Sequence, residues 1–200
     1  IVSPGNNKII YQDLAETYSA IEPPIWAGLL AKFARNQGHD TLLTDQEAQG
    51  LSSHQIVQQG VDLNPKLVVV VVYGQQPSAS TQNMTMAEEI CSKFRSQAPH
   101  LKTLMIGGHV SALPKKTLEE SDVDFVCQGE GPYTLQALLQ LGDLGSSDQL
   151  AKVPGLWYRQ NGKPVFSGPS PLVPERELSM VLNGIAWDML PMDVYRAHNW

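Results

Sequence analysis

Leu67-Val68-Val69-Val70-Val71-Val72 is an unbroken run of aliphatic residues that leads directly into Tyr73-Gly74. A strand with one face in water alternates apolar and polar residues, whereas an unbroken run indicates burial on both faces. Strands of this kind lie at the centre of parallel sheets that helices cover on each side. The run therefore predicts the central strand of an α/β fold.

Two further apolar segments, residues 104–106 and 125–127, share one property with this strand, because each also ends in a loop that contains glycine. The three loops are Gly74-Gln75-Gln76-Pro77-Ser78-Ala79-Ser80, Gly107-Gly108-His109-Val110-Ser111 and Gly129-Glu130-Gly131. Loops at the carboxyl ends of parallel strands surround the crevice where ligands bind. Glycine lets backbone approach a large ligand closely. The sequence therefore predicts one ligand site built from three loops.

The rest of the chain supplies the other elements of such a sheet. We expect strands at residues 1–2, 39–44, 67–72, 103–106 and 125–127, and helices at 25–34, 52–63, 80–98, 114–121 and 133–141. Ser52 and either Ser80 or Thr81 are the expected N-caps. This order predicts a flavodoxin-like, doubly wound, five-stranded parallel sheet with strand order 2-1-3-4-5.

The alternation of predicted strands and helices ends near Gly142. Asn161-Gly162 is a strong hairpin-turn signal, and it predicts a small β-hairpin over residues 153–166. A Pro-rich segment follows to the end of the sequence. We therefore expect a Rossmann-like domain at residues 1–145, and a hairpin with a linker at residues 146–200.

The composition limits the partners. With 42% hydrophobic and 17% charged residues the chain is globular, and no apolar run approaches the roughly 20 residues of a membrane helix. A net charge of -6 argues against nucleic acid, because phosphate binding relies on clustered Lys and Arg. Only Cys91 and Cys127 are present, which favours a reduced, cytoplasmic protein. We expect neither a membrane nor a nucleic-acid partner.

Few residues have a pattern that indicates a catalytic, metal-binding or ligand-binding role. His109 is either a metal ligand or proton carrier or, as we favour, a ring that packs against the loop or bonds to a backbone carbonyl. Glu130 fits a ligand contact and also fits a carboxylate at the start of the next helix. Trp26 and Phe33 lie on one helical stripe and are expected in the core. No catalytic residue and no protein-built metal site is predicted, because no nucleophile elbow, phosphate loop or paired metal ligands occur.

Four segments together resemble the N-terminal cobalamin-binding domain of cobalamin-dependent, class B type radical SAM enzymes. They are Glu22-Pro23-Pro24-Ile25-Trp26, Val72-Tyr73-Gly74-Gln75-Gln76-Pro77-Ser78-Ala79-Ser80, Gly107-Gly108-His109-Val110-Ser111-Ala112-Leu113-Pro114 and Gly129-Glu130-Gly131-Pro132-Tyr133. The tail from Trp187 to Trp200 resembles the segment that leads into the radical SAM domain. The C-x-x-x-C-x-x-C cluster motif of that domain is absent from the sequence.

The resemblance implies a cobalamin site at the carboxyl edge of the sheet. The implied cofactor-binding residues are Pro4, Gly5, Tyr73, Gly74, Gln75, Gln76, Pro77, Ser78, Ser80, Gly107, Gly108, His109, Val110, Gly129, Glu130 and Gly131. In the methionine-synthase type of domain, a D-x-H-x-x-G loop supplies a histidine to cobalt. Here the corresponding loop reads Ser3-Pro4-Gly5-Asn6-Asn7-Lys8, which implies base-off, His-off binding with cobalt carried by cobalamin alone.

In its intact form the protein is therefore expected to be a radical SAM methyltransferase, with a [4Fe-4S] cluster and S-adenosylmethionine in a radical SAM domain of the same polypeptide. The 200 residues alone are expected to be inactive. Two alternatives remain, a flavodoxin-like module for a flavin or nucleotide and a non-catalytic interaction domain. The first strand is not followed by a Ser/Thr-rich phosphate loop, and Tyr73-Gly74 stands where a receiver domain needs Asp, so both alternatives rank behind.

Overall fold

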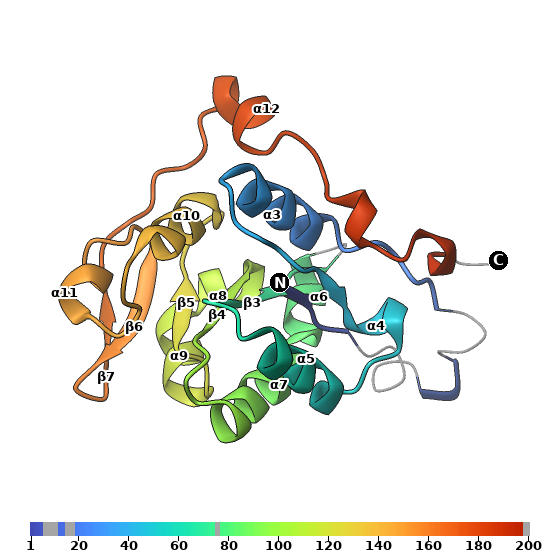
Figure 1. Cartoon of the computed structure of the whole chain (residues 1–200), viewed down its shortest axis with the longest axis horizontal. Helices are drawn as coiled ribbons and strands as arrows, with labels where there is room; N and C mark the ends of the chain where they lie inside the picture. The colour runs from blue at the N-terminus through green and yellow to red at the C-terminus, as the bar shows by residue number, and fades with distance from the viewer. Residues whose placement is uncertain (6–11, 15–18, 75–76, 198–200) are drawn as a thin grey trace.

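The computed structural model describes residues 1–5, 12–14, 19–74 and 77–197, and its centre is one seven-stranded sheet. The strand order is β2-β1-β3-β4-β5-β6-β7 (Figure 1). The first five strands in that row are parallel, in the predicted order 2-1-3-4-5. They are β1 (Val2–Ser3), β2 (Thr44–Asp45), β3 (Val68–Val72), β4 (Thr103–Gly107) and β5 (Phe125–Cys127).

The predicted count of five strands is wrong, because the hairpin joins the sheet. Strand β6 (Leu156–Gln160) pairs antiparallel with β5, and β7 (Lys163–Phe166) pairs antiparallel with β6. Without β6, β5 would be an edge strand with unpaired backbone groups. Asn161 and Gly162 both have positive φ, 53° and 75°, as a two-residue type I′ turn requires. The hairpin was predicted, but its pairing partner was not.

Helices cover both faces of the sheet (Figure 1). On one face lie α3 (Ile25–Asn36) and α10 (Pro132–Gln140), and on the other α5 (Ser53–Leu63), α7 (Met84–Gln97) and α9 (Pro114–Glu120). Strand β3 serves both layers, since Val69 and Val71 face the first pair of helices while Val68, Val70 and Val72 face the others. All five valines are buried, as the unbroken apolar run predicts.

Several element boundaries differ from the expectation, and two of the shifts are described here. The second strand covers Thr44–Asp45 instead of residues 39–44, because β1 pairs with it only through Val2 and Ser3. The helix expected to begin at Ser80 or Thr81 begins at Pro77, as α6 (Pro77–Gln82), and α7 continues after Asn83. Proline is favoured in the first turn of a helix, so α6 starts earlier than the predicted cap.

Short helices fill the connections. They are η1 (Gln12–Leu14), α4 (Gln46–Gln49), α8 (Gly108–Ala112), α11 (Ser147–Leu150), η2 (Glu175–Glu177), α12 (Leu178–Val181), η3 (Trp187–Met189) and η4 (Met192–Val194). The expected cap at Ser52 is confirmed, since Ser52 and Gln55 form a capping box at the start of α5. No helix within the described ranges is both long enough and apolar enough to span a membrane.

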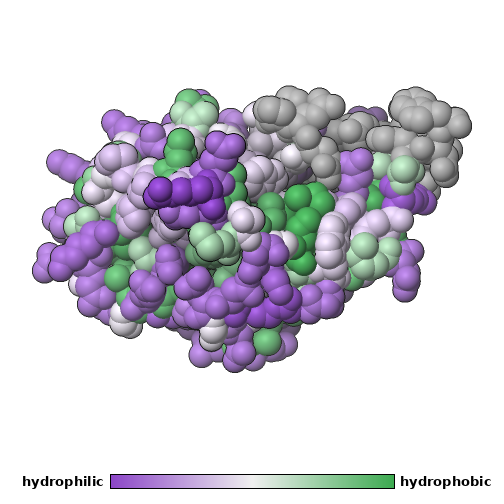
Figure 2. All heavy atoms as spheres, turned by 90° about the horizontal axis from the view of Figure 1, so that it is seen from above, coloured by the Kyte–Doolittle hydropathy of each residue, from purple (hydrophilic) through white to green (hydrophobic). Residues whose placement is uncertain are grey.

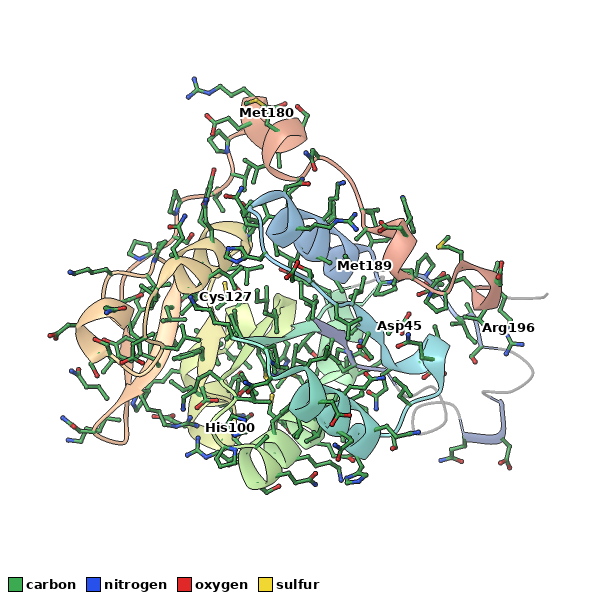
Figure 3. The ribbon with its side chains drawn as sticks, viewed as in Figure 1. Asp45, His100, Cys127, Met180, Met189 and Arg196 are labelled. Carbon is green, nitrogen blue, oxygen red and sulfur yellow. The ribbon has the colours of Figure 1, made fainter. Side chains whose placement is uncertain are left out.

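Residues 167–197, called the C-terminal strap below, cross the outer side of α3 instead of leaving the domain (Figure 1). The backbone amide of Ala186 donates to the carbonyl of Gly28 at 3.1 Å, and Ala186 is fully buried. Arg35 donates to both carboxylate oxygens of Asp188, at 2.6 and 2.9 Å. Figure 3 shows Met189 beside α3, and Arg196 further along the strap. The strap is therefore part of the packed fold.

Candidate functional site

The carboxyl edge of the sheet brings together loops that are distant in sequence. Ser80 connects two of them, because its buried hydroxyl donates to the Val72 carbonyl at the end of β3 and accepts the backbone amide of His109 at 2.9 Å. The backbone amide of Gly129, after β5, donates to the hydroxyl of Ser111 at 2.9 Å. The loops after β3, β4 and β5 thus form one hydrogen-bonded unit, as the sequence predicts.

Three glycines of these loops are required by the protein's own packing. A Cβ atom on Gly107 would lie 2.0 Å from the Val72 carbonyl oxygen, and one on Gly74 would lie 2.2 Å from the Cβ of Ala79. Gly131 has φ of +104°, and a Cβ there would lie 2.9 Å from Ile106. A side chain at any of these positions would force neighbouring backbone or core atoms to move. Their presence needs no ligand as an explanation.

Gly108 is different. A Cβ atom there would lie no closer than 3.7 Å to any described atom, which is ordinary van der Waals contact, and its φ is not positive. Gly108 is also the first residue of α8, where glycine costs stability relative to alanine. Neither packing nor backbone conformation accounts for this glycine. Because Gly108 has no side chain and is exposed, a bound molecule could approach its backbone closely at the loop after β4. We call this feature the open backbone of Gly108.

Other residues of the β4 loop and the β5 loop form hydrogen bonds or packing contacts within the protein. The Nδ1 atom of His109 lies 3.0 Å from the hydroxyl of Thr81 in α6, so its ring bonds to a side chain of another element and not, as we favoured, to a backbone carbonyl. Val110 is fully buried in the core. The carboxylate of Glu130 accepts the backbone amide of Val173 in the C-terminal strap at 2.7 Å. Glu130 therefore ties the strap to the site.

The loop after β1 approaches the same edge. The backbone amide of Gly5 donates to the side-chain oxygen of Gln46 at 3.2 Å, and Pro4 is buried. Asn6, Asn7 and Lys8 lie outside the described residues, as do Gln75 and Gln76, and the side chains of Pro77 and Ser78 are not described. The predicted contacts at those positions stay predictions.

Two aromatic rings at this edge stack on each other. The ring centroids of Trp26 and Tyr73 are 4.7 Å apart, with 24° between the ring planes. The predicted burial of Phe33 is confirmed, but that of Trp26 is wrong, because Trp26 is 39% exposed. Burial, and to a lesser degree the nearby Cys127 and Glu130, raises the pKa of Tyr73 to about 12. The phenol therefore stays protonated at neutral pH and is a hydrogen-bond donor.

Sequence reasoning also missed Asp45 and Tyr195. The Tyr195 hydroxyl donates to the Asp45 carboxylate at 2.8 Å, and the next residue, Arg196, forms an antiparallel bridge with Ile21. Figure 3 shows Asp45 and Arg196 on the same side of the molecule. Burial raises the pKa of Asp45 above its ordinary value. These contacts bring the end of the strap to the carboxyl edge, and no local motif announces a pairing between residues 150 positions apart.

Two further features bear on ligands. Within the described ranges, no three His, Cys, Asp or Glu side chains gather closely enough to hold a metal ion. A separate cavity opens at the opposite, amino edge of the sheet, and Leu42, Leu67 and Leu139 are among its lining residues. That cavity contains none of the glycine loops, so it is distinct from the predicted site.

Comparison with known proteins agrees with this fold. A family model for the B12 binding domain matches residues 11–139. The radical S-adenosylmethionine methyltransferase TsrM from Kitasatospora setae, with tryptophan substrate and a SAM analogue bound, has a TM-score of 0.63 and 17% identity over 85% of this chain and 30% of that chain. The cobalamin-dependent S-adenosylmethionine radical enzyme OxsB, with aqua-cobalamin and S-adenosylmethionine bound, has a TM-score of 0.59 and 17% identity over 91% of this chain and 24% of that chain.

A search of curated proteins finds no match. At this level of identity the likeness to TsrM and OxsB shows a shared fold, and the chain spans less than a third of either structure's chain.

Proposed function

The chain belongs to the B12 binding domain family, and from that premise we propose that its carboxyl-edge loops bind cobalamin. The observation that carries the proposal is Gly108, whose backbone is left open where neither packing nor φ requires glycine. A corrinoid is a large, flat molecule rimmed by amides, and it suits a site made of backbone groups and small residues. The same edge of an open α/β sheet is where ligands commonly bind.

The residues proposed to hold cobalamin are those implied by the resemblance. They are Pro4, Gly5, Tyr73, Gly74, Gln75, Gln76, Pro77, Ser78, Ser80, Gly107, Gly108, His109, Val110, Gly129, Glu130 and Gly131. Within this set we assign direct contact to the open backbone around Gly108 and to the Tyr73 side chain. Ser80, Val110 and Gly107 support the site indirectly by holding the loops in place, because their atoms contact other atoms of the protein.

We propose base-off, His-off binding, since the described residues of the loop after β1 are Pro4 and Gly5 and the following residues Asn6, Asn7 and Lys8 include no histidine. Bound cobalamin would supply a cobalt atom that can carry a methyl group. The residues of the chain would hold the corrinoid and exclude water from the ring face that lies against the protein. A cobalt without a protein imidazole suits a methyl carrier.

For the intact protein we propose a cobalamin-dependent radical SAM methyltransferase. Residues 1–145 would form the cobalamin-binding unit, and residues 146–200 would lead toward a radical SAM domain with a [4Fe-4S] cluster and S-adenosylmethionine. TsrM is a radical S-adenosylmethionine methyltransferase and OxsB is a cobalamin-dependent S-adenosylmethionine radical enzyme, and the likeness of fold to both supports the proposal. The C-terminal strap adds support, because it exposes large apolar side chains that a further domain could cover, including Leu172, Met180 and Met192. Hydrophobic residues are visible among hydrophilic ones on the face that Figure 2 shows.

Equilibrium dialysis tests cobalamin binding against the flavin alternative. The chain is dialysed against hydroxocobalamin and, separately, against flavin mononucleotide at the same concentration. Accumulation of cobalamin with no accumulation of flavin is the expected result. Accumulation of flavin alone would overturn the proposal in favour of the flavodoxin-like alternative, and accumulation of neither would also contradict it.

A further inference from the structure

Trp26 and Tyr73 meet at the carboxyl edge although they are far apart in sequence. Trp26 is the second residue of α3, and Tyr73 is the first residue after β3. In a parallel α/β sheet the helices begin at the edge where the strands end, so both residues belong to the edge that carries the glycine loops. Their stacked rings, 4.7 Å apart, form a continuous aromatic surface there.

This surface borders the open backbone of the β4 loop. A Cβ atom on Gly108 would lie 3.9 Å from Cε1 of Tyr73, so the phenol ring is a direct neighbour of that glycine. The side-chain amide of Asn83 donates to the Tyr73 carbonyl at 3.0 Å and fixes the backbone from which the ring projects.

The polar atoms of the two rings remain available. Within the described ranges no hydrogen bond joins the Tyr73 hydroxyl or the Trp26 indole nitrogen to another group, and Trp26 is 39% exposed. A second stack, Trp157 on Phe166, provides a contrast, because the indole N–H of Trp157 donates to Gln128 at 2.7 Å. The hairpin stack is thus satisfied within the protein, whereas the stack at the carboxyl edge is not.

We propose that the Trp26–Tyr73 stack is the wall against which the flat heteroaromatic base of the corrinoid's nucleotide tail packs. This inference rests on the proposed cobalamin binding and adds which part of the ligand these residues recognise. A single indole face matches the size of a bicyclic base, and aromatic side chains bind bases by stacking. The protonated Tyr73 hydroxyl then offers a donor to an acceptor of the tail.

The test compares two corrinoids that differ only in the tail. Hydroxocobalamin carries the nucleotide base and aquacobinamide lacks it, and the dissociation constant of each is measured for the unaltered chain, for Trp26→Ala and for Trp187→Ala. Trp187 is the matched control, since it is as exposed as Trp26, 41% against 39%, and lies in the C-terminal strap outside the Trp26–Tyr73 stack. Trp26→Ala is expected to weaken cobalamin binding about 10-fold and to change cobinamide binding by less than about twofold. Trp187→Ala is expected to change neither.

An equal loss for both corrinoids, or no loss for cobalamin, would overturn the inference while leaving cobalamin binding intact. If the unaltered chain binds neither corrinoid, the proposed function fails as well, so the two failures are distinguishable. Circular dichroism checks that Trp26→Ala is folded. Trp26→Phe, which keeps an aromatic ring, provides the second variant and is expected to lose less cobalamin affinity than Trp26→Ala. An equal loss in the two variants would contradict a stacking role.

Discussion

The backbone amide of His109 donates a hydrogen bond to the hydroxyl of Ser80 at 2.9 Å, and the same hydroxyl donates to the carbonyl of Val72. One small side chain therefore satisfies a donor and an acceptor on two neighbouring strand ends. Ser80 is 1% exposed, so water cannot replace it. This connection fixes the loops after β3 and β4 relative to each other, with Gly108 next to His109.

Replacing Ser80 by alanine should destabilise the fold. Ser80→Ala leaves the His109 amide and the Val72 carbonyl without their bond, which is expected to lower the free energy of unfolding by about 1–3 kcal/mol. Urea denaturation measures the change. Ser96→Ala is the control, because Ser96 is exposed and its hydroxyl donates only to the nearby Lys93 carbonyl. A loss no larger than that of the control would contradict the role assigned to Ser80.

Adjacent glycines should respond in opposite ways. Gly107→Ala places a Cβ 2.0 Å from the Val72 carbonyl and should destabilise the fold by about 1–3 kcal/mol or more. Gly108→Ala places a Cβ in ordinary van der Waals contact, 3.7 Å from Ser80, and favours helix α8, so the free energy of unfolding should stay within about 1 kcal/mol or rise. The cobalamin affinity of Gly108→Ala should nevertheless fall about 10-fold, because the alanine methyl group takes up the space beside the backbone that the corrinoid is proposed to contact. Denaturation and equilibrium dialysis give the two readouts, and unchanged affinity would show that Gly108 does not face the ligand.

Packing of the C-terminal strap on α3 depends on Gly28. A Cβ atom there would lie 2.4 Å from Cγ2 of Ile185, so Gly28→Ala should displace residues around 185. We expect faster cleavage within the strap in limited proteolysis. Gly142→Ala serves as the control, because a Cβ atom at Gly142 meets nothing within 4 Å. Equal cleavage rates in both variants would show that the strap does not depend on this contact.

The stability of the fold should depend on pH through Asp45. Burial raises the pKa of Asp45, and the hydrogen bonds from Tyr195 and Ala48 only partly oppose this effect. As pH rises past the ordinary carboxyl pKa, the unfolded chain releases this proton before the native protein does, so stability falls across that window. Asp45→Asn keeps an acceptor for both donors and removes the titration.

The difference in unfolding free energy, Asp45→Asn minus the unaltered chain, is therefore expected to grow from about pH 3 toward neutrality. Urea denaturation at several pH values measures it. The exposed Asp193, changed to Asn, is the control for a general charge effect. A difference that shrinks as pH rises would mean that the charged form of Asp45 is the one the fold favours.

Much of the sheet could be predicted from the sequence, because burial leaves a direct signature in the side chains. The valines of β3 are buried on both faces, and this places β3 at the centre of the parallel row. The pairing of β6 with β5 could not be predicted, since alternating residues of a hairpin indicate a half-buried strand but not its partner. The length of β2 could not be predicted either, because it is set by the two residues of β1 that pair with it.

The site could be predicted less completely. Glycine after a strand end announces a special backbone position, but it does not separate Gly107, which packing requires, from Gly108, which packing leaves open. Trp26 was expected in the core because helical spacing alone does not show which end of a stripe reaches solvent. The contacts of the strap, such as Tyr195 with Asp45, depend on the complete fold.

Cobalamin binding at these loops is tested most directly by the absorbance spectrum of the chain after titration with hydroxocobalamin and removal of free corrinoid by desalting. We expect retained corrinoid with a base-off spectrum that lacks the signature of a coordinated imidazole nitrogen. Retained corrinoid with that signature would contradict His-off binding, and a colourless protein fraction would contradict the proposal that these loops bind cobalamin.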